Sequence, residues 1–219
     1  ACGSLDHIAE LSLWDNFVGH CHSGAVALHG LFLSFAGGTL PKLEGLNLCR
    51  NGIIDDSLQT LTAVLKADPK HMLPSLVQLN LDENHIGSNG TVQLVEALAL
   101  GALPCLKELG LENNRIGDAG LKAFIACGTK GTLVSLLSLS LQIANEGITV
   151  SGVDALAAAL RDGALPSLKW LILPAALELR ASLRDVCGAR GIHQCLESED
   201  EGEGEGEGEG EDEGEDEDE

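Results

Sequence analysis

Residues 103–120 read Leu103-Pro104-Cys105-Leu106-Lys107-Glu108-Leu109-Gly110-Leu111-Glu112-Asn113-Asn114-Arg115-Ile116-Gly117-Asp118-Ala119-Gly120. The leucines from Leu106 to Leu111 are spaced as Leu-x-x-Leu-x-Leu, and the alternation at its end is typical of a strand. Asparagine and glycine then indicate a turn. From Gly120 onward, apolar residues return every three or four positions, as in a helix. The stretch therefore predicts a strand, a turn and a helix in that order.

The same unit recurs along the chain, with an apolar residue at the first position of the pattern and leucine at the fourth. The fourth position of the pattern falls at residues 11, 46, 79, 109, 139 and 171, so the copies are 30 to 35 residues apart. Helical spacing follows in residues 90–98, 120–125 and 153–160, and loops such as Gly101-Ala102-Leu103-Pro104 lead back to the next strand. Repeated strand and helix units predict an α/β protein in which a parallel sheet carries helices on one side.

An asparagine follows the strand pattern at a fixed place in four copies. Asparagine has both donors and acceptors, so a buried carboxamide can satisfy backbone groups that a turn leaves without partners. Stacked repeats would align these residues into a ladder with a structural role: Asn16, Asn51, Asn84 and Asn114. The fifth copy has Ala144 in register and Asn145 one residue late, and the sixth has Ala176. We expect the ladder to loosen toward the C-terminus.

Residues 73–87 and 103–120 resemble leucine-rich repeats of the ribonuclease-inhibitor type. The resemblance covers residues 5–196. It implies a right-handed curved solenoid with the parallel β-sheet on the concave face, helices on the convex face, and recognition usually through the concave face. We therefore expect residues 1–196 to form a leucine-rich-repeat solenoid of about six repeats.

The ends of a solenoid need covers, because an open last repeat exposes its core. Residues 177–187 have the spacing of a last amphipathic helix, ended by Gly188, and residues 191–196 have the pattern of a short final strand. The most apolar stretch, residues 24–40, is 17 residues long and contains His29 and four glycines. It is too short to span a bilayer, so we interpret it as a buried repeat helix and expect no membrane association.

The charge of the chain is concentrated at its C-terminus. The net charge is −21, and residues 197–219 contain 16 Asp or Glu, six Gly and one Ser. Repulsion between like charges predicts a disordered, extended acidic tail. Two interpretations of the tail remain open: a polyanionic arm for basic surfaces or cations, and a solubilising end. Since Lys and Arg are not clustered, we expect no direct nucleic-acid binding.

Seven cysteines without paired spacing are typical of reduced thiols. They favour a cytoplasmic or nuclear protein, which we expect to be a monomer.

Strand alternation predicts which side chains lie on the open face of the sheet. The middle of that face would be polar and acidic, with one tryptophan toward either end, and would suit a protein partner with a basic or polar surface. The two tryptophans can equally be packed under the terminal segments. The candidate partner-binding residues are Trp14, Asn47, Arg50, Gln78, Asn80, Asp82, Glu108, Glu112 and Trp170.

Catalytic and metal-binding motifs are weak in this sequence. Residues 19–22 read Gly-His-Cys-His and His29 follows, but no second pair of ligands stands nearby as a tetrahedral zinc site needs. Cys187, His193 and Cys195 lie five repeats away in the expected fold. The phosphate-binding and nucleophile motifs are absent. We expect no metal, no cofactor and no enzymatic activity.

Two functions remain from the sequence. The favoured one is a non-enzymatic scaffold that binds a protein on its concave face. The alternative comes from the layout of a repeat body followed by an acidic tail, which is similar to the Ran GTPase-activating protein family. That resemblance implies a regulator of a small GTPase, with an arginine at a strand exit acting on the nucleotide in trans. Arg50 and Arg115 are the available arginines.

Overall fold

Six short parallel strands form one open sheet in the computed structural model, which describes residues 5–16, 22–36, 40–141, 147–174 and 180–194. The strands are β1 (Glu10–Ser12), β2 (Gly45–Asn47), β3 (Gln78–Asn80), β4 (Glu108–Gly110), β5 (Ser138–Ser140) and β6 (Trp170–Ile172). Their order in the sheet is β1-β2-β3-β4-β5-β6, so each strand pairs with its neighbours in sequence. All six strands predicted from the repeat are confirmed.

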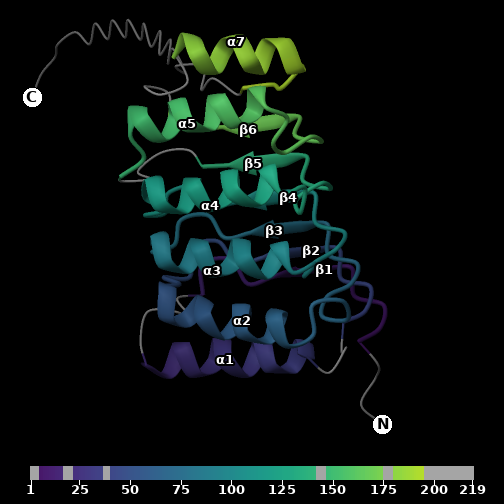
Figure 1. Ribbon diagram of the computed structural model, residues 1–219. Helices are drawn as coiled ribbons and strands as arrows, with labels where there is room; N and C mark the ends of the chain where they lie inside the picture. The colour runs from purple at the N-terminus through teal and green to yellow at the C-terminus, as the bar shows by residue number, and fades with distance from the viewer. Residues whose placement is uncertain (1–4, 17–21, 37–39, 142–146, 175–179, 195–219) are drawn as a thin grey trace, which may run out of the picture.

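A helix follows each strand and packs on one side of the sheet. The helices are α1 (His22–Ala36), α2 (Asp55–Ala67), α3 (Ser88–Ala99), α4 (Gly117–Thr129), α5 (Val150–Arg161) and α7 (Ala181–Arg190). Figure 1 shows them stacked in a single column, each beside the helix of the next repeat, with the strands behind. The predicted solenoid with one strand face and one helix face is confirmed. We call the sheet face that points away from the helices the concave face.

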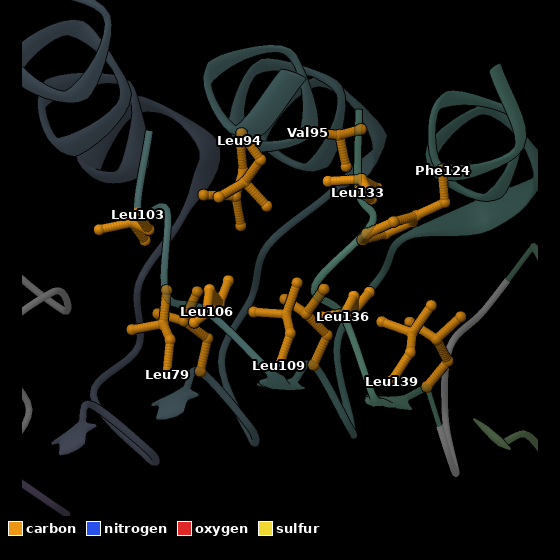
Figure 2. Packing of buried hydrophobic residues seen from close by; sticks show 14 of the residues in the cluster. Leu79, Leu94, Val95, Leu103, Leu106, Leu109, Phe124, Leu133, Leu136 and Leu139 are labelled. Carbon is orange, nitrogen blue, oxygen red and sulfur yellow. The ribbon is translucent and has the colours of Figure 1, made fainter. Parts of the chain in front are cut away.

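The core lies between the sheet and the helix column. The central leucine of each strand from β2 to β6 is at most 2% exposed, as Leu79, Leu109 and Leu139 show in the middle of the solenoid. Figure 2 shows these three leucines in a row, pointing toward Leu94 and Phe124 on the helices. Full burial of one such side chain contributes about 1.5–3 kcal/mol. Equivalent leucines lie at the same place in the neighbouring units, so the core is continuous along the solenoid.

The asparagine ladder forms where the strands end. Asn84 is 2% exposed. Its Nδ2 donates to the carbonyls of Leu48 and Leu81, at 3.0 and 2.9 Å, and to that of Asp82. Its Oδ1 accepts the N–H of Asn51 at 3.0 Å and that of Ile53 at 2.9 Å. Each carboxamide therefore joins two repeats, as the spacing predicted.

The other rungs follow the same plan. Asn51 and Asn114 are buried and donate to the carbonyls of Leu13 and Leu81, respectively. Asn16, which follows the first strand, is exposed. Residues 144, 145 and 176, where the sequence predicts that the ladder fails, lie outside the described residues.

Residues 24–36 of the apolar stretch belong to helix α1, as predicted, whereas residues 37–39 lie outside the described residues. Leu28, Phe32 and Phe35 on this helix are at most 1% exposed and pack in the core. The helix has 15 residues. Within the described part of the chain, none of the helices has both the length and the apolar character needed to cross a membrane.

The predicted last helix differs from the observed one. Helix α7 runs through Gly188 and ends at Arg190, because Gly191 adopts a left-handed conformation with φ 65° that closes the helix. Residues 175–179, where the predicted helix begins, are outside the described residues. Beyond the helix, His193 forms a parallel bridge with Trp170, which confirms the final strand pairing at that residue. Residues 197–219 are not described, so the acidic tail as a separate region stays a prediction.

Candidate functional site

The strand register aligns two rows of residues on the concave face. The first row joins Glu10, Gly45, Gln78, Glu108, Ser138 and Trp170, and the second joins Ser12, Asn47, Asn80, Gly110, Ser140 and Ile172. Both rows point away from the core because the leucine between them on each strand points into it. The open face of the sheet and these two rows are therefore as strand alternation predicted.

A shallow hollow of about 130 Å³ lies in the middle of this face, across β3, β4 and β5. It is lined by Gln78, Leu79, Asn80, Asp82, Glu108, Leu109, Gly110, Ser138 and Ser140. We call it the Asp82 hollow. Four of the nine predicted partner-binding residues line it, and Glu112 contacts two of the lining residues.

Gly110 makes room for the acidic side chain beside it. A Cβ at this position would lie 2.7 Å from Oδ1 of Asp82, which is closer than real Cβ contacts allow. The Asp82 carboxyl therefore lies over the backbone of β4, where any other residue would place a side chain. The same arrangement occurs at Gly45, where a Cβ would collide with the carboxyl of Glu10.

Hydrogen bonds hold the Asp82 carboxyl in this position. Its Oδ1 accepts the backbone N–H of Glu112 at 2.7 Å, and its own N–H donates to Oδ1 of Asn80 at 2.9 Å. Partial burial, together with the negative charge of Glu112, raises the pKa of Asp82 to about 6, against the lowering effect of the hydrogen bond from Glu112. Asn47 braces the preceding turn in the same way as Asn80, by accepting the N–H of Cys49.

Glu112 extends this network to the next strand. Its Oε1 accepts a hydrogen bond from the hydroxyl of Ser140, which is 7% exposed. Among the residues that the structure describes, neither Asp82 nor Glu112 forms an ion pair. The centre of the concave face thus holds two oriented carboxylates without a neutralising cation.

Trp14 lies toward one end of the face and is 51% exposed. The guanidinium carbon of Arg50 is 5.7 Å from the centre of the Trp14 ring, which is within cation–π range. Nε of Arg50 also lies 3.2 Å from Oε2 of Glu83. Arg50 therefore covers part of the Trp14 ring, and about half of the side chain is exposed.

Trp170 lies toward the other end and is 45% exposed. The ring of His193 stacks on it at 4.6 Å between centres, with an angle of 28° between the planes. The C-terminal segment thus covers one side of this tryptophan, as one of the two interpretations from the sequence proposed.

Sequence reasoning did not include Gly110, Ser138 and Ser140 among the binding residues. All three line the hollow, and Ser140 orients Glu112. Strand alternation could have identified them, because they occupy the same two rows of the sheet as Gln78 and Asn80. Small residues give no chemical signature by themselves, and they matter here because they leave space.

The potential metal ligands do not come together in the described part of the chain. His29 lies on α1 with Nδ1 at 3.2 Å from the hydroxyl of Thr60. Cys187 is buried in the core, and burial raises the pKa of its thiol to about 11. The described residues contain no group of three or more His, Cys, Asp or Glu side chains that could hold a metal ion. The side chains of residues 20–22 are outside the described set.

Comparison with known proteins supports the fold. Residues 102–124 match the family described as Leucine Rich repeat. The C-terminal domain of tropomodulin from Caenorhabditis elegans has a similar structure, with a TM-score of 0.52 and 15% sequence identity over 74% of this chain and 84% of that one. None of the curated proteins matches the chain in sequence. The chain therefore has a leucine-rich-repeat fold, and identity this low gives the fold without a function.

Proposed function

We propose that this protein is a non-enzymatic scaffold that binds a protein partner with a basic surface on its concave face. Leucine-rich-repeat folds generally serve protein–protein interaction, which supports the broad class. The observation that carries the proposal is the uncompensated acidic centre of the face, at Asp82 and Glu112, lying between two half-exposed tryptophans.

The size of the face suits a protein segment. Six strands with spacings of about 4.8 Å give a face about 24 Å wide, comparable to a helix of about 16 residues at 1.5 Å per residue. Tryptophans are frequent anchors in protein interfaces because they bury a large apolar area. Trp14 and Trp170 would anchor the ends of such a segment, and the acidic centre would select a basic middle.

No contact in the described residues favours the alternative role as a GTPase-activating protein. That role requires an arginine free to reach a bound nucleotide. Arg50 is held between the Trp14 ring and Glu83. Arg115 is exposed in the segment between β4 and α4.

Charge reversal on the face tests the proposal. Glu108 is the first residue of β4 and is exposed, so Glu108→Lys changes the face without disturbing the core. Asp185→Lys makes the same change of charge on exposed α7 and serves as the matched control. We expect proteins captured by the full chain to be lost with Glu108→Lys and retained with Asp185→Lys. An unchanged set of captured proteins with both Glu108→Lys and Trp14→Ala would overturn the proposal.

A further inference from the structure

The Asp82 hollow has the chemistry of a socket for one cationic side chain. Its polar lining combines the carboxyls of Asp82 and Glu108 with amide groups from β3 and hydroxyl groups from β5, over the open backbone of Gly110. We propose that the hollow takes a lysine side chain from the partner protein. This inference rests on the proposed function and names the group that the concave face recognises.

The charge balance of the hollow supports a cation. Asp82 and Glu112 repel each other, and the described residues bring no ion pair to either one. Arg50, at the exit of the neighbouring strand β2, lies against Glu83 and Trp14 instead. Burial and, to a smaller extent, the negative charge of Glu112 raise the pKa of Asp82, and an ammonium group in the hollow would favour the charged carboxylate.

A metal ion fits less well than a side chain. A metal needs several oxygen ligands converging on one point, and the described residues contain no such group of acidic side chains. One oxygen of Asp82 and one of Glu112 are already engaged by the Glu112 N–H and the Ser140 hydroxyl.

The same hydrogen bonds favour lysine over arginine. Arginine recognises a carboxylate best with two parallel bonds, which require both carboxylate oxygens to be available. Here Oδ1 of Asp82 and Oε1 of Glu112 each already accept a bond from the protein, so neither carboxylate offers two unengaged oxygens to a guanidinium group. A compact ammonium with three donors can use single acceptors distributed around it. The lining offers such acceptors on β3, β4 and β5.

The charge of Asp82 can be removed with little change of shape. Asn in place of Asp82 keeps an oxygen for the Glu112 N–H and loses the negative charge. The matched control is Glu83→Gln, which removes the same charge one residue away, on a side chain that faces Arg50 outside the hollow. Both variants keep residues 197–219, so binding of a cation to the acidic tail is the same in the two.

The experiment is a titration of the full chain, labelled with ¹⁵N, with the peptide acetyl-Gly-Gly-Lys-Gly-Gly-amide. The amide signals of Gly110 and Glu112 report on the hollow. We expect saturable shifts of these signals with a dissociation constant in the millimolar range, weakened about tenfold when the lysine is acetylated or when Asp82 is replaced by Asn. The arginine peptide should bind several-fold more weakly, and Glu83→Gln should bind like the unmodified protein.

The outcomes separate this inference from the proposed function. Equal binding of the lysine and acetyl-lysine peptides, or shifts equal in Asp82→Asn and Glu83→Gln, would overturn the lysine socket. So would shifts of the same signals by magnesium or calcium at the same concentration. If the socket fails while Glu108→Lys still abolishes capture of a partner, the concave face remains the binding surface and only its ligand is wrong.

Discussion

The first four repeats and the last two are built from the same strand and helix, but they satisfy their polar groups by different means. From β1 to α4, buried neutral asparagines join one repeat to the next at the strand exits, in addition to charged contacts at the surface such as that between Lys66 and Glu96. From α5 to α7, the side-chain hydrogen bonds between repeats in the described residues all involve charged groups. Arg180 and Ser182 donate to Asp154, and Arg190 donates to the carbonyls of Leu160, Ala164 and Leu165.

The difference follows from burial. Asn51, Asn84 and Asn114 are at most 2% exposed, and a charged side chain placed there would lose its hydration. Asp154, Arg180 and Arg190 are half-exposed, so their charges remain in contact with water. A solenoid can therefore use neutral polar groups in its interior and charged ones at its end, where α7 closes the stack.

The largest effect is expected when the ladder is broken at its most connected rung. Asn84→Ala leaves the N–H groups of Asn51 and Ile53 without their acceptor and takes one donor from each of three carbonyls, of which those of Leu81 and Asp82 keep another. Since each buried group left without a partner costs about 1–3 kcal/mol, we expect a loss of about 3–4 kcal/mol in the free energy of unfolding, allowing for some entry of water. Unfolding in urea measures it.

Asn16→Ala is the matched control, because this first rung is exposed. Its loss should be below about 1 kcal/mol. Equal losses for Asn16→Ala and Asn84→Ala would mean that burial does not decide what the ladder contributes.

The ladder could be predicted from the sequence because its signal is periodic. Asn51, Asn84 and Asn114 stand at one place in the repeat, and that place alone implies both burial and neighbours. The charged contacts of the last repeats could not be predicted in this way. Arg190 reaches back 25 to 30 residues to three carbonyls, and nothing periodic marks it. The end of α7 was misplaced for a related reason, since either Gly188 or Gly191 could have closed the helix and only packing decides between them.

Removal of Arg190 tests the closure of the C-terminal end. Arg190→Ala deletes three hydrogen bonds from a charged donor, so we expect a loss of about 2 kcal/mol. Hydrogen exchange should become faster in residues 159–165 and in α7, and remain unchanged in α2 and α3. Arg184→Ala, on the exposed face of the same helix, is the control and should leave exchange unchanged. Faster exchange throughout the solenoid would show that the end is not a separate region.

The two rows of residues on the concave face were predicted from the sequence, but the Asp82 hollow between them was not. Alternation along the strands placed Gln78, Asn80 and Glu108 on one face, as observed. The hollow itself depends on the absence of a side chain at Gly110 and on the turn of Asp82 over β4, and these are three-dimensional facts.

Asp82→Asn should stabilise the protein at neutral pH. For a fully enclosed carboxylate, the raised pKa corresponds to a loss of about 3 kcal/mol in the free energy of unfolding. Asp82 is partly exposed, and solvent screening reduces this loss to about 1.5 kcal/mol. The folded state of the unmodified protein takes up a proton near pH 6 and the unfolded state near 4, so this loss disappears as pH falls through this window. Urea unfolding at pH 7.5 and at pH 4 measures the difference. An Asn variant less stable than the unmodified protein at pH 7.5 would contradict a repulsive acidic centre.

The smallest effect is expected at Asp154, and its dependence on pH has the opposite sign. Hydrogen bonds from Ser182 and Arg180, together with the positive charge of Arg180, lower the pKa of Asp154 below its ordinary value. The folded state therefore holds this proton less tightly than the unfolded state, and the contribution of Asp154 to stability is present above the ordinary pKa of aspartate, near 4, and is lost as pH falls below it. Asp154→Ala should speed hydrogen exchange in α7 at pH 7, and this effect should become smaller as pH falls below 4, after correction for the intrinsic exchange rate. Acid should therefore weaken the contacts that hold α7 on the last repeats. It does so at pH values at which Asp82 is already protonated and no longer destabilises the centre of the sheet. An Asp154→Ala effect on α7 that persists unchanged at pH 2.5 would show that packing, and not the charged contacts, closes this end.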